Sequence, residues 1–105
     1  MLSKAKEAIR QSRRILIDQM KLQSGCMDCG YAENAVALDF DHLPGCDKKF
    51  NISQSIVNHS WESVLAEIAK CEIVCSNCHR IREWERRNAT NASITRRQSE
   101  QLVGS

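Results

Sequence analysis

The residues best suited to chemistry are four cysteines in two Cys-x-x-Cys pairs, Cys26 with Cys29 and Cys75 with Cys78. Two intervening residues let both sulfurs of a pair reach one tetrahedral ion, and four thiolates complete a structural zinc site. One pair alone would also suit a redox dithiol, and the set could instead form disulfides or stay as buried thiols. Two pairs in one short chain favour a structural Zn²⁺.

An Asp-His pair and a further histidine accompany these cysteines. Asp41 and His42 follow Leu38-Asp39-Phe40, between the two pairs, and His79 directly follows Cys78. In this order the elements resemble the HNH nuclease family, in the zinc-bearing form common in phages and bacteria. The resemblance covers about residues 25–87 and is specific, because three separated motifs occur in sequence.

This resemblance implies a small zinc-stabilised ββα-metal (HNH) fold of the α+β class, here with an added N-terminal helix. It implies a metal-dependent endonuclease that nicks or cleaves DNA. Asp41 and His79 would hold a catalytic divalent ion, Mg²⁺ with Mn²⁺ or Ni²⁺ as substitutes, and water and phosphate oxygens would fill its other positions. His42 would be the general base, since an imidazole can accept a proton near neutral pH.

The sequence departs from the family pattern at several positions. Many HNH proteins carry an asparagine nine residues before the last histidine, where it clamps the loop between the strands; this chain has Lys70, which cannot accept a hydrogen bond. Asn77 is an alternative for that role. Glu83, four residues after His79, is either a third metal ligand or a surface glutamate. His59 is expected to be structural.

The length of 105 residues allows one domain with a small core, so zinc should contribute to folding. No apolar run is long enough to span a bilayer, and the N-terminus does not read as a secretory signal. Six cysteines, four with metal spacing, fit a reducing cytoplasm, that of the host cell if a phage encodes the chain. Cys46 and Cys71 are expected to be packed free thiols rather than extra ligands.

Charge divides the chain into three parts. Residues 1–24 have six basic and two acidic side chains. Residues 25–79 have three basic and eight acidic side chains, and residues 80–105 have six basic and three acidic side chains. Basic arms around an acidic centre suit an enzyme that acts on a polyanion, although they could simply be solvated helix faces. We expect a basic N-terminal helix (1–24), a nuclease core (25–88) and a polar tail (89–105). The candidate phosphate contacts are Lys48, Lys49, Arg80, Arg82 and Arg86.

Periodicity predicts helices over residues 2–22, 61–69 and 77–87, with Ser60 capping the second. It predicts strands over 35–41 and 72–74. Strict alternation would place Asp41 and His42 on opposite faces, so we expect the chain to bend there. Trp61, Val64, Leu65 and Ile68 form the expected buried stripe of the middle helix, and Ile81 and Trp84 that of the last.

Two other functions stay open at this stage. A non-catalytic zinc module that binds nucleic acid or protein would make Asp41 and His42 incidental. A dithiol redox protein would use the cysteines themselves. The residues do not choose between single- and double-stranded DNA, between nicking and full cleavage, or between a monomer, a homodimer and a complex with another protein.

Overall fold

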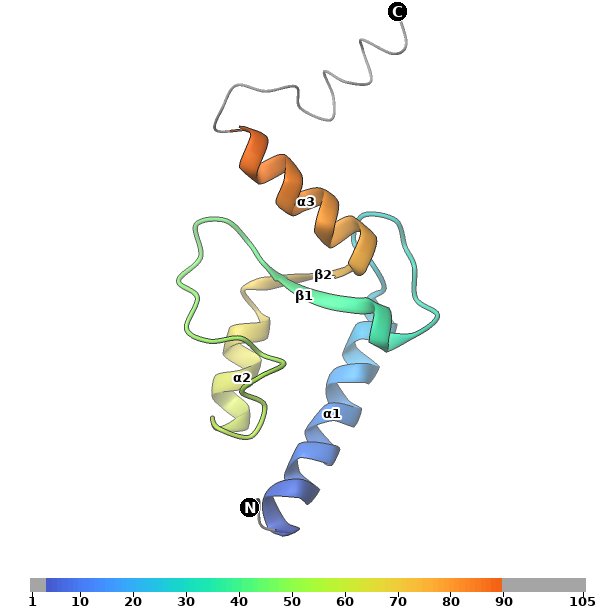
Figure 1. Ribbon diagram of the computed structural model, residues 1–105. Helices are drawn as coiled ribbons and strands as arrows, with labels where there is room; N and C mark the ends of the chain where they lie inside the picture. The colour runs from blue at the N-terminus through green and yellow to red at the C-terminus, as the bar shows by residue number, and fades with distance from the viewer. Residues whose placement is uncertain (1–3, 90–105) are drawn as a thin grey trace, which may run out of the picture.

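The computed structural model describes residues 4–89. Its elements are, in chain order, α1 (Lys4–Ser24), the 3-10 helix η1 (Ala35–Ala37), β1 (Leu38–His42), α2 (Trp61–Ile68), β2 (Cys71–Cys75) and α3 (Ser76–Ala89). β1 and β2 form a two-stranded antiparallel sheet (Figure 1). The α+β class is therefore confirmed.

The sheet separates α3 from the other two helices, which lie on its opposite side in Figure 1. Leu38 pairs with Cys75, Phe40 with Ile73 and His42 with Cys71, so these residues share the face toward α1 and α2. Asp39 and Asp41, with Val74 and Glu72 opposite them, occupy the face toward α3. Alternation along β1 thus sends neighbouring side chains to different helices.

Local signals account for the helix ends. α1 ends at Ser24, where Gly25 takes a φ of 67°, a left-handed conformation that favours glycine just after a helix. α2 begins after Ser60, whose side chain accepts a hydrogen bond from the backbone N–H of Ser63. Both boundaries agree with the sequence prediction to within two residues. Leu2 and Ser3 of the first predicted helix lie outside the described residues.

Two small apolar clusters stabilise the chain, and one of them includes two of the paired cysteines. One consists of Ile17, Ile52, Ile56 and Val64, with Phe40, Trp61 and other partly buried side chains packed against it. The other consists of Cys26, Leu38, Val74 and Cys75. The second cluster contains two of the four paired cysteines, so a metal held by these cysteines would be attached directly to the core.

The predicted strand 35–41 is wrong at both ends. Asn34 accepts a hydrogen bond from the backbone N–H of Val36 and starts a 3-10 turn, so β1 begins only at Leu38. β1 then continues through His42 without the expected bend, because His42 still pairs with Cys71.

Three side chains predicted to be buried are exposed. Leu65 of α2 and both Ile81 and Trp84 of α3 face solvent. Glu67 is buried instead, because it forms a polar network described below. No residue of α3 is fully buried, and the helix meets the sheet through the partly buried Cys78 and through the ion pairs of Arg82 and Arg86 with Asp41. Residues 90–105 of the predicted tail lie outside the described residues. Within residues 4–89, no helix is both long enough and apolar enough to cross a bilayer.

Candidate functional site

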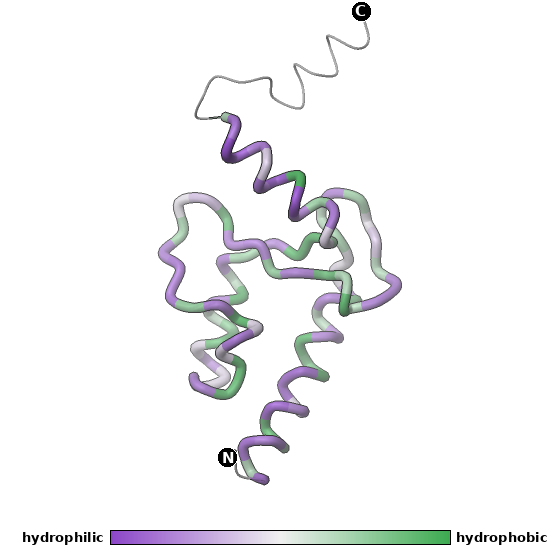
Figure 2. Tube along the Cα trace, viewed as in Figure 1, coloured by the Kyte–Doolittle hydropathy of each residue, from purple (hydrophilic) through white to green (hydrophobic). Residues whose placement is uncertain are grey.

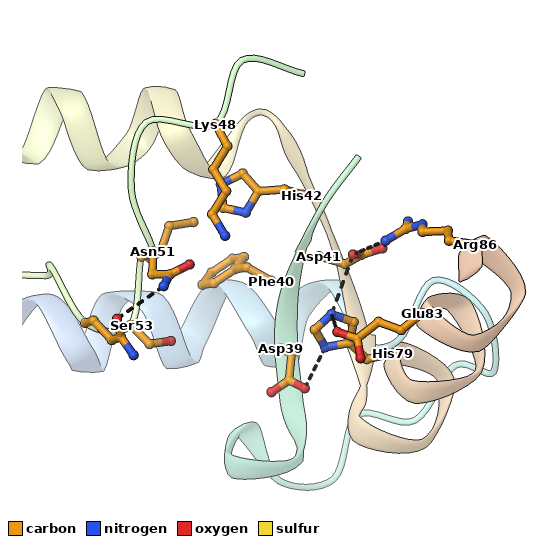
Figure 3. Close-up of a pocket in the computed structure, with 12 residues that line it drawn as sticks. Asp39, Phe40, Asp41, His42, Lys48, Asn51, Ser53, His79, Glu83 and Arg86 are labelled. Carbon is orange, nitrogen blue, oxygen red and sulfur yellow. Dashed lines mark hydrogen bonds and ion pairs between the residues drawn. The ribbon is translucent and has the colours of Figure 1, made fainter. Parts of the chain in front are cut away.

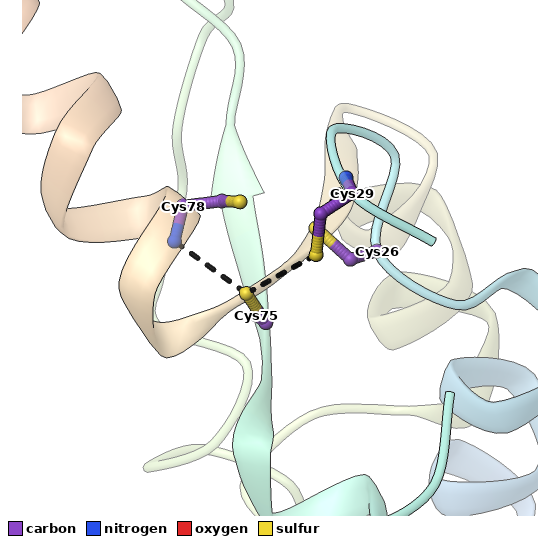
Figure 4. Close-up of side chains that lie close together, drawn as sticks. All are labelled: Cys26, Cys29, Cys75 and Cys78. Carbon is purple, nitrogen blue, oxygen red and sulfur yellow. Dashed lines mark hydrogen bonds between the residues drawn. The ribbon is translucent and has the colours of Figure 1, made fainter. Parts of the chain in front are cut away.

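The four paired cysteines converge on one point (Figure 4). Their sulfur atoms all lie within 4.8 Å of one another, although the two pairs are almost fifty residues apart in the chain. Cys26 and Cys29 lie on the turn after α1, Cys75 ends β2, and Cys78 lies in the first turn of α3. Within the described residues this is the only cluster of three or more such ligand atoms.

Backbone amides point at the sulfurs in both turns. The N–H groups of Asp28 and Cys29 lie 3.4 Å from Cys26 Sγ, and that of Cys78 lies 3.5 Å from Cys75 Sγ. Burial raises the pKa of the Cys26 thiol, but such hydrogen bonds outweigh it and lower the pKa to about 6. Burial raises the pKa of Cys78, which a bound cation would reverse because coordination deprotonates a thiol.

The donor set fits a zinc ion. Cys29 Sγ and Cys75 Sγ are 3.7 Å apart, and two ligands of a tetrahedral ion with roughly 2.3 Å bonds lie roughly 3.8 Å apart. All four cysteines are free rather than disulfide-bonded. The cluster can therefore hold a structural metal such as zinc, as the spacing predicts.

A second site is a cavity of about 480 Å³ between β1, the loop after it and the first turns of α3 (Figure 3). Asp41, His42 and His79, the three residues predicted to be catalytic, all line it. Asp41 and His42 leave β1 in opposite directions, as alternation requires, and the cavity extends far enough along the strand to include both. The arrangement therefore brings the motif together despite the missing bend.

Asp41 is buried and held by two arginines of α3. Arg86 donates to both of its carboxylate oxygens at 2.8 Å, and Arg82 donates to Oδ2 at 2.8 Å. The side chain is only 3% exposed. Burial raises the pKa of this carboxyl, but the two guanidinium groups outweigh it and hold the pKa below its usual value. Asp41 is thus ionised and fully paired.

His79 stands at the centre of three carboxylates. Its Nδ1 lies 3.1 Å from Asp39 Oδ2, which fixes the ring, and its Nε2 lies 3.6 Å from Asp41 Oδ1 and 3.5 Å from Glu83. A carboxylate behind one ring nitrogen is the usual arrangement for a metal-binding histidine, because it orients the other nitrogen toward the ion. Two neighbouring ligands of an octahedral ion with roughly 2.1 Å bonds lie roughly 3 Å apart. The distance of 3.6 Å between Asp41 Oδ1 and His79 Nε2 is slightly longer than that, and Asp41 Oδ1 already accepts a hydrogen bond from Arg86.

His42 is anchored by a buried glutamate on α2. Its Nε2 lies 2.9 Å from Glu67 Oε2, which also accepts the backbone N–H of Lys49 at 2.9 Å. Glu67 Oε1 accepts from Lys70 Nζ at 2.9 Å. Burial raises the pKa of the Glu67 carboxyl, but these three donors lower it to about 2. Glu67 is therefore an anion that holds the His42 ring in place.

Lys70, which stands where the HNH resemblance would place an asparagine, holds the loop between the strands. Its ammonium donates to the backbone carbonyl of Asp47 at 2.6 Å as well as to Glu67, so it ties the loop between the strands to the end of α2. The ammonium of Lys70 can hold the loop although it cannot accept a hydrogen bond, because the loop presents the backbone carbonyl of Asp47 as an acceptor. Asn77, the alternative, lies beside Arg80, Ile81 and Trp84 and does not line the cavity.

The five predicted phosphate contacts have different surroundings. Lys48 and Arg86 line the cavity. Lys49 is exposed and pairs with Asp47, and Arg80 is exposed on α3. Arg82 is bound by Asp28 and Glu72 as well as Asp41, so its guanidinium holds the fold together rather than facing a ligand.

Sequence reasoning missed three residues of this site. Asp39 supports His79, Glu67 supports His42, and Asn51 lines the cavity from the loop after β1. Asp39 could have been found from its place two residues before Asp41 on the same strand face. Glu67 had no comparable signal, since a glutamate between apolar helix positions usually faces solvent. His59, as expected, is structural: its ring stacks on Phe50 with the centroids 3.9 Å apart.

No family model matches this chain, and no curated protein or solved structure matches it either. The functional assignment therefore depends on the geometry described above and on the motif that the sequence contains.

Proposed function

We propose that this protein is a metal-dependent endonuclease of the HNH type that hydrolyses DNA phosphodiester bonds. The observation that carries the proposal is the shared cavity of Asp41, His42 and His79, residues that come from β1 and α3. A base, two candidate metal ligands and the cationic side chains of Lys48 and Arg86 surround one space. That combination suits attack of water on a phosphate.

His42 acts as the general base in this proposal. Because Glu67 engages Nε2, that nitrogen carries the proton and Nδ1 is left as the acceptor for a proton from water. Glu67 fixes the ring and stabilises the imidazolium that forms. The arrangement is a histidine–carboxylate pair with the carboxylate buried behind it.

Asp41 and His79 would bind the divalent ion, with Glu83 as a third ligand. When bound, the ion would neutralise charge that develops on the phosphate and on the leaving 3′ oxygen, giving a 5′-phosphate end. Asp39 orients His79 Nε2 toward that position. The zinc centre supports the same ligand, because Cys78 fixes the first turn of α3 immediately before His79.

Metal binding requires Asp41 to give up part of its contact with Arg86. Arg86 can yield, because its side chain is 36% exposed and lines the cavity, whereas Arg82 is 16% exposed and held by three carboxylates. A released Arg86 guanidinium would be placed to bind a phosphate oxygen. Arg86 is then a partner of Asp41 in the free protein and of the substrate in the complex.

The test is cleavage of supercoiled plasmid in Mg²⁺ or Mn²⁺. We expect nicking by the wild type, and a loss of at least about a hundredfold in His42→Ala, Asp41→Asn and His79→Ala. The matched control is His59→Ala, which removes the remaining histidine outside the cavity and should retain activity. Zinc content and circular dichroism of each variant separate loss of chemistry from loss of fold. Absence of cleavage by folded wild type with every metal would refute the proposal.

A non-catalytic zinc module is the second candidate, and one observation favours it. Arg82 and Arg86 already satisfy both oxygens of Asp41, as in a structural ion pair. α3 also exposes Ile81 and Trp84 beside Arg80, a surface suited to binding a macromolecule. Under this reading the protein binds DNA or another protein equally well before and after His42→Ala and cleaves nothing.

A further inference from the structure

A small cavity of about 60 Å³ adjoins the larger cavity described above. Phe40, Ile52 and Ser53 line both, so the space beside β1 continues past the loop after that strand. Ser53 lies next to α1 in Figure 3. The side chains that α1 contributes to the small cavity are Arg14, Ile17, Asp18 and Lys21. We call this small cavity the α1 extension.

Helical periodicity explains why α1 directs charged side chains into the α1 extension. Arg14, Ile17 and Lys21 are three and four residues apart, so they lie on the same side of the helix. Ile17 is buried in the first apolar cluster and attaches that side to the domain. Figure 2 shows hydrophilic positions recurring between the hydrophobic ones along α1. The residue that anchors the helix therefore fixes a cation on either side of it, next to the larger cavity.

The two cations of the α1 extension lack a close ionic partner. Arg14 is exposed, and among residues 4–89 no hydrogen bond or ion pair holds its guanidinium. Lys21 is half-buried with its Nζ 5.2 Å from the centre of the Phe40 ring. Burial lowers the pKa of Lys21, although the carboxylates of Asp18 and Asp39 act in the opposite direction. An anion bound in the α1 extension would compensate both positive charges.

The larger cavity has few cations of its own to offer a nucleic acid. Lys48 and Arg86 line it, but Arg86 is paired with Asp41. A DNA strand has one negative charge per nucleotide, so a strand with one phosphate in the larger cavity carries further charges beyond it. Arg14 and Lys21 stand where the cavity continues, and they are available to those phosphates.

We propose that the α1 extension binds the DNA backbone next to the scissile phosphate, with Arg14 and Lys21 as its phosphate contacts. The inference rests on the proposed function, because it places the scissile phosphate in the larger cavity. Asp18 opposes the binding, since its carboxylate lines the same space. Contacts of this kind fix the position of the strand without reading bases. The helix that precedes the nuclease core is thus part of the substrate site.

Fluorescence anisotropy of a labelled DNA duplex tests the two cations. The zinc-loaded full chain is used with Mg²⁺ in a His42→Ala background, which prevents cleavage during the measurement. Arg14→Gln and Lys21→Gln should each weaken binding about three- to tenfold and reduce the slope of log K against log salt by about 1, and the double variant should reduce it by about 2. The matched control is Lys4→Gln, which removes an exposed cation of the same helix that lines neither cavity and should change binding by less than about twofold.

Asp18→Asn tests the same site with a change in the opposite direction. Loss of this carboxylate should tighten DNA binding about two- to fivefold, because it removes a repulsion and leaves Lys21 to the phosphate. Damage to the helix would weaken binding instead. The matched control is Glu7→Gln, which removes the same charge from the first turn of α1, outside both cavities, and should have a smaller effect. Circular dichroism and zinc content confirm that each variant is folded.

Plasmid nicking by the chain with His42 intact keeps this inference separate from the nuclease proposal. If the wild type nicks DNA but Arg14→Gln and Lys21→Gln bind it as well as Lys4→Gln does, the inference is overturned and the nuclease stands. If the wild type nicks nothing but both substitutions weaken DNA binding, the nuclease fails and the binding surface on α1 stands. A folded chain that binds no DNA would also overturn the inference.

Discussion

The cysteine cluster and the cavity are both built from residues far apart in sequence, yet they satisfy their charges in opposite ways. The four cysteines converge, and backbone amides donate to the sulfurs of Cys26 and Cys75. In the cavity, every carboxylate of the motif already has a cationic or histidine partner. The first site could take up an ion without displacing a partner, whereas the second would have to exchange one partner for another.

We expect this difference to separate a site that stabilises the fold from a site that carries the proposed activity. Four thiolates without a counter-ion repel one another, so we expect folding and metal binding to be coupled. Asp41 is stable without metal because arginines neutralise it, which lets the cavity form before any ion or substrate arrives. The zinc-type centre should therefore control stability, and the cavity should control activity.

The largest effect is expected from removing the metal of the cysteine cluster. Cys75→Ser, or a strong chelator, should unfold the chain, because zinc binding contributes about 10 kcal/mol in comparable small sites. Cys75 belongs to the second apolar cluster, so its loss also removes core contacts. Circular dichroism checks the fold, and mass spectrometry under native conditions checks one zinc per chain.

Cys46→Ser is the control for that experiment. Cys46 is a free, partly exposed thiol outside the metal cluster, so the substitution should change neither the zinc content nor the unfolding transition. A Cys75→Ser protein that stays folded without metal would show that the apolar clusters alone suffice. The contrast between the two sites would then disappear.

The next largest effect concerns the buried pair of Asp41. Arg82→Met should lower the free energy of unfolding by about 3 kcal/mol, because it removes a cation that three carboxylates share. Arg80→Met, two residues earlier and exposed, should change it by less than about 0.5 kcal/mol. Urea titration with zinc in excess measures both. Equal effects would mean that Asp41 is not an internal ion pair in solution.

The sequence anticipates the two sites unequally, for a physical reason. Spacing of two residues between cysteines determines local geometry, so each Cys-x-x-Cys pair and the helix caps follow from short-range rules, whereas the meeting of the two pairs does not. The partners inside the cavity are long-range: Arg86 lies forty-five residues from Asp41, and Glu67 twenty-five from His42. No periodicity encodes such pairs. Because such long-range pairs cannot be predicted from periodicity, the sequence did not reveal the three carboxylates that bind Arg82. For the same reason, Ile81 and Trp84 were predicted to be buried although they are exposed.

A smaller effect, with a definite pH dependence, is expected at Glu67. Its folded-state pKa of about 2 lies below the usual value of 4.5, so its ionised form stabilises the fold above pH 4.5 and that contribution is lost as the pH falls toward 2. Glu67→Gln should therefore lower the free energy of unfolding by about 1–3 kcal/mol at pH 7. The difference between variant and wild type should shrink as the pH falls below 4.5.

Any zinc lost in acid would destabilise the wild type and the Glu67→Gln variant alike. The difference between their free energies of unfolding therefore isolates the contribution of the Glu67 carboxylate. Urea titrations at a series of pH values provide the comparison. A constant difference across the acid range would show that the carboxylate is not held as an anion by Lys70 and the Lys49 amide.

The smallest effect distinguishes two adjacent lysines. Lys48 lines the cavity, whereas Lys49 is exposed and pairs with Asp47 at 2.9 Å. If DNA occupies the cavity, Lys48→Ala should weaken binding several-fold and reduce the slope of log K against log salt by about 1, and Lys49→Ala should do less. Fluorescence anisotropy in a His42→Ala background avoids cleavage during the measurement. Sequence cannot separate these neighbours, so a larger effect at Lys49 would place the nucleic acid on the outer surface of the loop and away from the motif histidines.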